Sequence, residues 1–176
     1  MTTTATLPVL EMSSPLGPLV LATAGRSLRL LAFGSRGEGD LDQLLGADLP
    51  VDREEDERLL EDVRARLRAY FEGELRALDG IPADPLGTAF QTSVWKALRT
   101  IPAGKTASYG EIARKIGRES ACRAVGAANG RNPVAIVIPC HRVIGSNGTL
   151  TGYGGGLDRK SWLLRHEGAL ERELFS

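Results

Sequence analysis

The octapeptide LDGIPADP, residues 78–85, divides the chain into two stretches of different composition. Its two prolines and two aspartates favour turns and interrupt any continuous helix or strand. Residues 1–85 hold 9 Lys and Arg against 16 Asp and Glu, whereas residues 86–176 hold 13 against 6. The formal net charge of zero therefore hides an acidic half and a basic half. We predict two domains, residues 1–85 and 86–176, the second able to face a polyanion unless its charges merely solvate helix faces.

The composition is that of an ordinary globular protein, with 42% hydrophobic and 25% charged residues, which excludes global disorder. No apolar run approaches the roughly 20 residues of a membrane span. The N-terminal MTTTATLPVL lacks the basic segment and the apolar core of a secretory signal. We therefore expect a cytoplasmic protein with no membrane partner, whose Cys122 and Cys140 are reduced. With His141 and His166 they match no zinc-ligand spacing, so no metal is expected.

The first half combines strand patterns with one long helix pattern. Residues 17–23 and 28–33 are short strand-like runs on either side of Ala24-Gly25-Arg26, which predicts a β-hairpin. Residues 34–53 are rich in Gly, Asp and Pro and predict a loop. Between Glu54 and Leu75, apolar residues recur at helical spacing, which predicts an amphipathic helix with a core-facing side of Leu59, Leu60, Val63, Leu67, Tyr70 and Phe71. This is the pattern of a small mixed α/β domain.

The second half predicts short helices. Thr88-x-x-Gln91 and Ser108-x-x-Glu111 match capping boxes, and Gly117 ends the helix that the second box begins. Residues 119–129 predict a further helix, so that the two neighbours resemble a helix-turn-helix. This last helix has almost no bulk and carries one long side chain, Arg123. It can approach another surface closely, whether a nucleic acid or a helix of the same protein. A terminal helix is expected over residues 158–167.

The stretch IVIPCHRVIG, residues 136–145, places a thiol, an imidazole and a guanidinium between two apolar runs. The first run predicts a scaffold strand that ends at Pro139, which lacks a backbone N–H. A reactive thiolate needs a base or a positive charge beside it, and His141 and Arg142 are the candidates. Neighbours on a strand point to opposite faces, so direct contact of Cys140 with His141 requires a bend or a bridging water. Cys140 is either a nucleophile or a small buried hydrophobe.

Several motifs occur in the order and spacing of a known family. PCHRV at 139–143 resembles the active-site motif of the O6-alkylguanine-DNA alkyltransferases, also called methylated-DNA–protein-cysteine methyltransferases. The resemblance continues in FQTSVWKALRTIPAGKTASYGEIA, RAVGAANGRNP, GYGGGLDRK and WLLRHEG. It covers residues 87–168 closely and residues 8–85 loosely. It implies an α/β (α+β) two-domain fold: a small N-terminal mixed α/β, RNase H-like domain, then a mostly helical domain with a helix-turn-helix and the active-site cysteine.

The resemblance implies direct-reversal DNA repair. The alkyl (methyl) group of O6-alkylguanine in duplex DNA, with O4-alkylthymine left open, would pass irreversibly to Cys140. The alkyl carbon is inaccessible while the base is stacked, so the base must flip out. Because a thioether is too stable to reverse, the protein would be a single-turnover, suicide methyltransferase without a cofactor. Its partner would be double-stranded DNA, bound by a monomer, with clustering of molecules on DNA left open.

The resemblance also implies catalytic roles. Cys140 would be the nucleophile, His141 its base through a water, and Glu167 the group that orients and charge-stabilises His141. Asn132 would tie the turn between the active-site strand and the recognition helix, which is the helix expected over residues 119–129. Tyr109 would help to rotate the nucleotide and would donate a proton toward the departing guanine.

DNA-binding and pocket residues follow from the same resemblance. Arg123 would fill the gap left by the flipped base, beside a minor-groove face that also holds Tyr109, Gly126, Ala127 and Ala128. The carbonyls of Cys140 and Val143 would accept the guanine amino group, and the Gly154 N–H would lie near O6. The pocket would be formed by Val143, Tyr153, Gly154, Gly155 and Lys160. Cys122 replaces a residue that is usually small in the family, and we expect it to be structural filler.

Two functions of other classes remain open from the sequence. A cysteine hydrolase also pairs Cys with His, but it would turn over many substrates. A transcription factor with a helix-turn-helix would discriminate between DNA sequences. A lesion-binding relative without catalysis would lack the cysteine, which is present here as Cys140.

Overall fold

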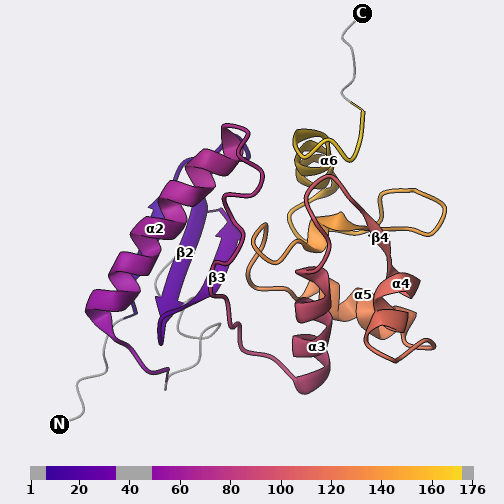
Figure 1. The fold of residues 1–176 in the computed structure, drawn as a ribbon, viewed down its shortest axis with the longest axis horizontal. Helices are drawn as coiled ribbons and strands as arrows, with labels where there is room; N and C mark the ends of the chain where they lie inside the picture. Colours follow the sequence, from indigo (N-terminus) through magenta and orange to yellow (C-terminus); the bar gives the residue numbers. More distant parts are fainter. Residues whose placement is uncertain (1–6, 35–48, 172–176) are drawn as a thin grey trace, which may run out of the picture. The chain divides into compact units, whose positions relative to one another are not determined.

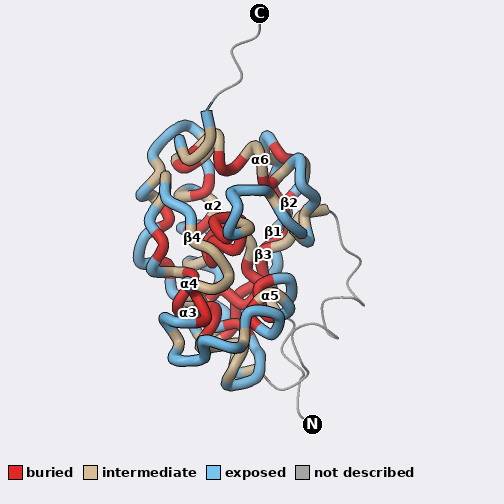
Figure 2. The backbone as a smooth tube through the Cα atoms, turned by 90° about the vertical axis from the view of Figure 1, so that its right-hand side faces the viewer, coloured by how far each residue is buried: buried red, intermediate tan, exposed pale blue. Residues whose placement is uncertain are grey.

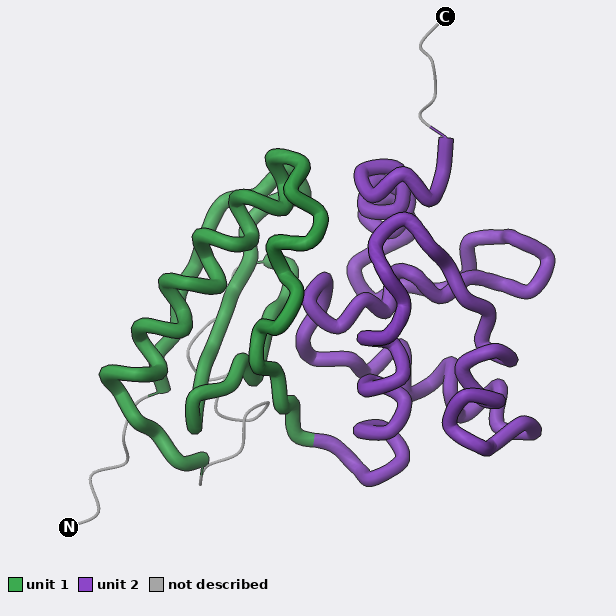
Figure 3. The backbone as a smooth tube through the Cα atoms, in the orientation of Figure 1, with its two compact units in different colours: residues 1–86 green, residues 87–176 purple. Residues whose placement is uncertain are grey.

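The computed structural model describes residues 7–34 and 49–171. The chain forms two compact units, residues 1–86 and residues 87–176 (Figure 3). Most of the loop predicted over residues 34–53 and the first six residues of the N-terminal segment lie outside the described residues. Within the described ranges, no helix is long and apolar enough to cross a membrane.

Unit 1 contains a three-stranded antiparallel sheet with strand order β1 (Val9–Met12), β2 (Leu19–Ala24) and β3 (Ser27–Phe33). The predicted hairpin is confirmed: β2 pairs with β3, and the turn between them places Gly25 and Arg26 at positive φ. Strand β1 was not predicted from the sequence. It is a four-residue edge strand without a clean polar–apolar alternation, the kind that a sequence pattern reveals least.

Helix α2 (Arg53–Phe71) lies along the sheet (Figure 1). The predicted helix is confirmed, but it ends four residues before Leu75 because Gly73 adopts a positive φ of 113° just after the cap. Its buried side is Leu60, Val63, Leu67 and Tyr70, whereas Leu59 and Phe71 are only partly buried. Buried residues are coloured red in Figure 2.

Unit 2 is mostly helical. Its elements are α3 (Ala89–Leu98), β4 (Ala107–Ser108), α4 (Tyr109–Lys115), α5 (Cys122–Gly130), a 3-10 turn η1 (Cys140–Arg142), β5 (Val143–Ile144) and α6 (Leu157–His166). Both predicted capping boxes are present, with Thr88 and Gln91 at α3 and with Ser108 and Glu111 at α4. The short strands β4 and β5 pair in parallel. This pairing brings the start of α4 next to the segment that follows the 3-10 turn.

Helix α5 packs one side against α3 and α4. Val125 and Ala128 are buried there, and the Trp95 indole N–H donates to the Ala128 carbonyl over 2.9 Å. Arg123 and Ala127 are exposed on the other side. The small residues of α5 therefore serve close packing on the inner side, and its outer side exposes Ala127 and the long Arg123.

The apolar run before Cys140 is not a strand, and this prediction was wrong. The segment folds into tight turns, in which the Ile138 N–H donates to the Val134 carbonyl over 3.1 Å and Ile136 adopts a φ of +68°. Ile136 and Ile138 are buried. The run is apolar because it fills the core beneath the 3-10 turn, and burial alone does not distinguish a strand from a buried turn.

Candidate active site

The 3-10 turn η1 consists of Cys140, His141 and Arg142. Three residues complete one such turn, so consecutive side chains point in three different directions rather than alternating between two faces. Cys140 carries a free thiol and is 5% exposed. The chain therefore bends in a helical turn just after Pro139 and does not continue as a strand.

Asn132 holds the chain that leads into this turn. Its side-chain amide donates to the Ile138 carbonyl over 2.8 Å and accepts from the Val134 N–H over 3.0 Å. The Asn129 amide also donates to the Cys140 carbonyl over 3.4 Å. The segment is irregular and has no regular helix or sheet ladder, and the two asparagine side chains bond to its backbone groups. The hydrogen bonds therefore fix the position of the thiol.

Burial raises the pKa of the Cys140 thiol, and a hydrogen bond with Asn132 and the positive charge of Lys160 offset part of that rise. The pKa remains above its ordinary value, so the thiol is protonated at neutral pH. A thiol in this state is a weak nucleophile, and it needs a base at the moment of reaction.

His141 and Glu167 form a buried pair, 0% and 4% exposed. His141 Nε2 lies 2.9 Å from Glu167 Oε1. Burial lowers the pKa of His141, and Glu167 counteracts only part of this effect, so the imidazole is neutral at physiological pH. Burial raises the pKa of Glu167, but hydrogen bonds from His141 and Arg142 outweigh it and hold the pKa far below its usual range.

This pairing decides the tautomer of His141. An ionised carboxylate only accepts hydrogen bonds, so Nε2 carries the proton and donates to Glu167. The lone pair then lies on Nδ1, which is buried and has no hydrogen-bond partner among the described residues. A buried acceptor without a partner is rare in proteins, and here it is a nitrogen that can take up a proton.

Arg142 acts on Glu167 rather than on the thiol. Its Nε and Nη2 donate to the two carboxylate oxygens over 2.9 and 2.8 Å, and Nη1 donates to the Ile101 carbonyl over 2.6 Å. The expectation that Arg142 lowers the pKa of the thiol is corrected: Lys160 supplies the nearby positive charge. This bidentate bond could not be predicted from the sequence pattern, because its two residues are 25 positions apart.

Lys160 is completely buried on α6. Its ammonium donates to the Val143 carbonyl over 2.6 Å and to the Thr151 carbonyl over 2.8 Å. Burial lowers the pKa of Lys160, and the neighbouring Cys140 raises it. Lys160 therefore connects α6 to two segments that follow the thiol in the chain, at Val143 and at Thr151.

Tyr153 also belongs to the surroundings of the thiol. Burial raises the pKa of its phenol well above the ordinary value, and the charge and a hydrogen bond of Cys140 raise it further. Tyr153 therefore remains a neutral phenol near the sulfur. The glycines on either side of it, Gly152 and Gly154, are exposed.

Two protein-family models match the chain. The family model for the 6-O-methylguanine DNA methyltransferase DNA binding domain matches residues 89–169, and the family model for the ribonuclease-like domain of the same enzymes matches residues 11–85. The methylated-DNA–protein-cysteine methyltransferase of Shigella flexneri is 48% identical over 165 residues, which cover 91% of this chain and 95% of that protein. The chain belongs to the 6-O-methylguanine DNA methyltransferase family. The predicted family and the predicted fold class of a mixed N-terminal and a helical C-terminal domain are thereby confirmed.

Two further members of the family are similar along most of their length. The Mycobacterium leprae protein is 49% identical over 157 residues, covering 89% of this chain and 90% of that protein. The crystal structure of Mycobacterium tuberculosis OGT in complex with DNA has a TM-score of 0.76 and 46% identity, and the match covers 92% of each chain.

The residues expected in the methyltransferase site fall into two groups. Around the thiol lie His141, Glu167, Asn132, Lys160 and Tyr153. On the helix-turn-helix, Arg123 and Ala127 are exposed and Gly126 is partly buried, whereas Ala128 faces the core. We therefore leave Ala128 out of the surface that we propose below. Cys122 is exposed on α5, so it does not fill the core as expected.

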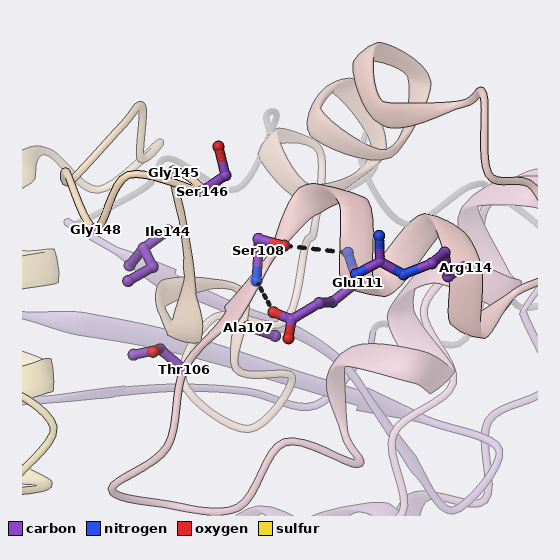
Figure 4. Close-up of a pocket in the computed structure, with 9 residues that line it drawn as sticks. All are labelled: Thr106, Ala107, Ser108, Glu111, Arg114, Ile144, Gly145, Ser146 and Gly148. Carbon is purple, nitrogen blue, oxygen red and sulfur yellow. Dashed lines mark hydrogen bonds between the residues drawn. The ribbon is translucent and has the colours of Figure 1, made fainter.

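A polar hollow of about 420 Å³ lies between the start of α4 and the turn at residues 145–148 (Figure 4). The Ser108 hydroxyl accepts from the Glu111 N–H over 3.1 Å, and the Glu111 carboxylate accepts from the Ser108 N–H over 2.6 Å. These bonds lower the pKa of Glu111. The capping box thus forms a rigid wall of this hollow and fixes the first residue of α4, Tyr109.

Proposed function

We propose that this chain repairs O6-alkylguanine in duplex DNA by moving the alkyl group irreversibly to Cys140. Family membership supplies the reaction class, methyl transfer from methylated DNA to a protein cysteine. The observation that carries the assignment to Cys140 is the buried thiol next to a neutral His141 whose Nδ1 has no partner among the described residues. The Mycobacterium tuberculosis relative has been crystallised with DNA, which supports DNA as the partner.

The chemistry proceeds as one displacement. The thiol proton passes through a water to His141 Nδ1, and the anionic Glu167 stabilises the imidazolium that forms. The sulfur attacks the alkyl carbon, so an S–C bond forms while the C–O bond to guanine breaks. Guanine leaves with the electron pair and takes a proton, for which we propose the Tyr109 phenol as donor. This leaves an imidazolium at His141 and a phenolate at Tyr109, and both become neutral when the proton returns from His141 to Tyr109 through water. The net products are neutral guanine and an S-alkyl thioether.

The outer side of α5 suits an approach to a DNA groove. Its exposed residues include the small Ala127 and the long Arg123, with the partly buried Gly126 between them in sequence. Small side chains allow close contact with the minor groove, and an inserted side chain replaces the stacking that a flipped base loses. The surplus of Lys and Arg in residues 86–176 supports binding to a polyanion.

The reaction needs a reduced thiol, and both Cys122 and Cys140 are free. We therefore include a cytoplasmic, reducing environment in the proposal. Among the described residues, no group of three or more His, Cys, Asp or Glu side chains could hold a metal ion. The displacement above uses only side chains of this chain and a water.

The proposal predicts a fixed stoichiometry. Limiting protein is mixed with excess duplex DNA that contains O6-[methyl-³H]methylguanine, and protein-bound label is counted until it stops rising. We expect one methyl group per protein molecule, because the thioether is not hydrolysed. Continued loss of label from DNA beyond one equivalent would support a hydrolase that turns over. A transcription factor would transfer no label and would discriminate between scrambled duplexes.

The role proposed for Arg123 predicts a difference between substrates. Arg123→Ala should slow transfer from duplex DNA by roughly tenfold or more, since the cost of unstacking the base is no longer compensated. Transfer from the free base O6-methylguanine should change by less than about twofold, because no duplex is opened. Arg118→Ala, which removes an exposed arginine before α5, is the matched control. Equal losses on both substrates would contradict the role of Arg123 in base flipping.

A further inference from the structure

The segment between the turn at Gly145 and helix α6 has few means of holding its shape. Residues 150–156, which we call the pocket loop, contain no helix or strand, and four of the seven are glycines. Glycine loses more backbone entropy on ordering than any other residue. A loop of this composition needs anchors from other elements if it is to form the wall of a reaction site.

Thr151 is held at two points by two different helices. Its hydroxyl lies 3.0 Å from the Tyr109 hydroxyl, at the start of α4. Its carbonyl accepts from the Lys160 ammonium of α6 over 2.8 Å. The same ammonium donates to the Val143 carbonyl. Its charge offsets part of the rise that burial causes in the pKa of Cys140. Thr151 therefore connects Tyr109, which is proposed to rotate the nucleotide, to Lys160, whose charge acts on the pKa of the Cys140 thiol.

One edge of the Tyr109 ring faces α5 at Gly126. A Cβ atom on Gly126 would lie 3.8 Å from Cδ1 and Cε1 of the Tyr109 ring, so the ring borders α5 at ordinary van der Waals distance. The phenol thus spans from the proposed recognition helix to the pocket loop. A side chain whose hydroxyl is already held loses less entropy when it engages a substrate.

We propose that Thr151 is a positioning residue, which holds the Tyr109 hydroxyl and the pocket loop in the arrangement that reacts with duplex DNA. The inference rests on the proposed function, because it assigns Tyr109 a task during base flipping. The Thr151 side chain acts only through Tyr109. Its carbonyl bond to Lys160 is made by the backbone and is kept in any side-chain variant.

The kinetic test uses three substitutions at matched positions. Thr151→Val keeps the shape and removes the hydroxyl, and it should slow single-turnover transfer from duplex DNA about fivefold. Thr151→Ser restores the hydroxyl and should recover the rate to within about twofold. Thr149→Val removes another hydroxyl of the same segment, whose partner is Asn147, and should have little effect. Equal rates for Thr151→Val and Thr151→Ser would overturn the proposal.

A double-mutant cycle isolates the bond to Tyr109. Because Tyr109→Phe already removes the partner hydroxyl, adding Thr151→Val to it should cause no further slowing. A fivefold additional loss in the double variant would show that Thr151 acts by another route.

Amide hydrogen exchange tests the anchor without any methyl transfer. Exchange in a peptide that covers the pocket loop should be several times faster in Thr151→Val and in Tyr109→Phe than in wild type or in Thr151→Ser. If wild type transfers no methyl group but this pattern holds, the proposed function fails and the anchor stands. Unchanged exchange in Thr151→Val would overturn the anchor whatever the activity.

Discussion

Cys140→Ala is expected to abolish methyl transfer and to leave DNA binding intact. The substitution removes the only atom that the displacement uses to form a new bond, so the rate should fall by at least about 10³-fold. Alanine is smaller than cysteine, and it fits the space of a side chain that is 5% exposed without any backbone change. Label transfer from methylated duplex measures the rate, and an electrophoretic shift with the same duplex measures binding.

The matched control for this prediction is the other thiol of the chain. Cys122→Ala should transfer the methyl group at the wild-type rate, because Cys122 is exposed on α5 and is not part of the buried cluster of Cys140, His141 and Glu167. Retained transfer in Cys140→Ala, together with a loss in Cys122→Ala, would move the nucleophile to α5. Loss of DNA binding in Cys140→Ala would show that the thiol has a structural role as well.

Glu167→Gln should have the second-largest effect, on both rate and stability. The variant no longer stabilises the imidazolium of His141, and we expect the rate to fall by about 10²–10⁴-fold, as for other oriented His bases. It also leaves the Arg142 guanidinium buried without a counter-charge. Breaking a buried ion pair costs about 3–5 kcal/mol of unfolding free energy. Because the Gln side chain can still accept a hydrogen bond from Arg142, we expect a loss near the lower end of this range.

The comparison for this variant is Glu171→Gln, which makes the same change at an exposed carboxylate four positions later. It should alter neither the rate nor the denaturant midpoint. Rates are compared at a temperature where both variants are folded by circular dichroism, so that the stability effect does not enter the rate. A folded Glu167→Gln protein that transfers methyl groups at the wild-type rate would refute the role of Glu167.

The helices of unit 2 could be predicted well because their ends carry local chemistry. Thr88 with Gln91, and Ser108 with Glu111, lie three residues apart and act within one helical turn, so the sequence alone contains the information. The hairpin of β2 and β3 is local for the same reason. These interactions depend on neighbours along the chain and not on the tertiary fold.

The surroundings of the thiol could be predicted only through the family resemblance. The resemblance pointed to Glu167 as the partner of His141, and the two lie 2.9 Å apart. The bidentate bond of Arg142 to Glu167 and the bond of Thr151 to Tyr109 join residues 25 and 42 positions apart. No spacing rule links such residues, because the tertiary fold alone brings them together.

The apolar run that precedes the thiol shows a different limit. Ile136 and Ile138 have the high β-propensity of branched residues, yet the segment is a buried turn held by Asn132. Propensity describes how a residue fits a pleated surface, and no strand of the described part of the chain pairs with Ile136 or Ile138. The polar side chain that satisfies the backbone decides the local structure here.

The central claim is that Cys140 itself receives the alkyl group. Protein that has reacted with O6-methylguanine duplex is digested, and its peptides are sequenced by mass spectrometry. We expect the peptide with Cys140 to gain the mass of one CH2 group in proportion to the methyl groups removed from DNA, while the peptide with Cys122 is unchanged. A methyl group found on Cys122 alone, or on neither cysteine while DNA is repaired, would contradict the account.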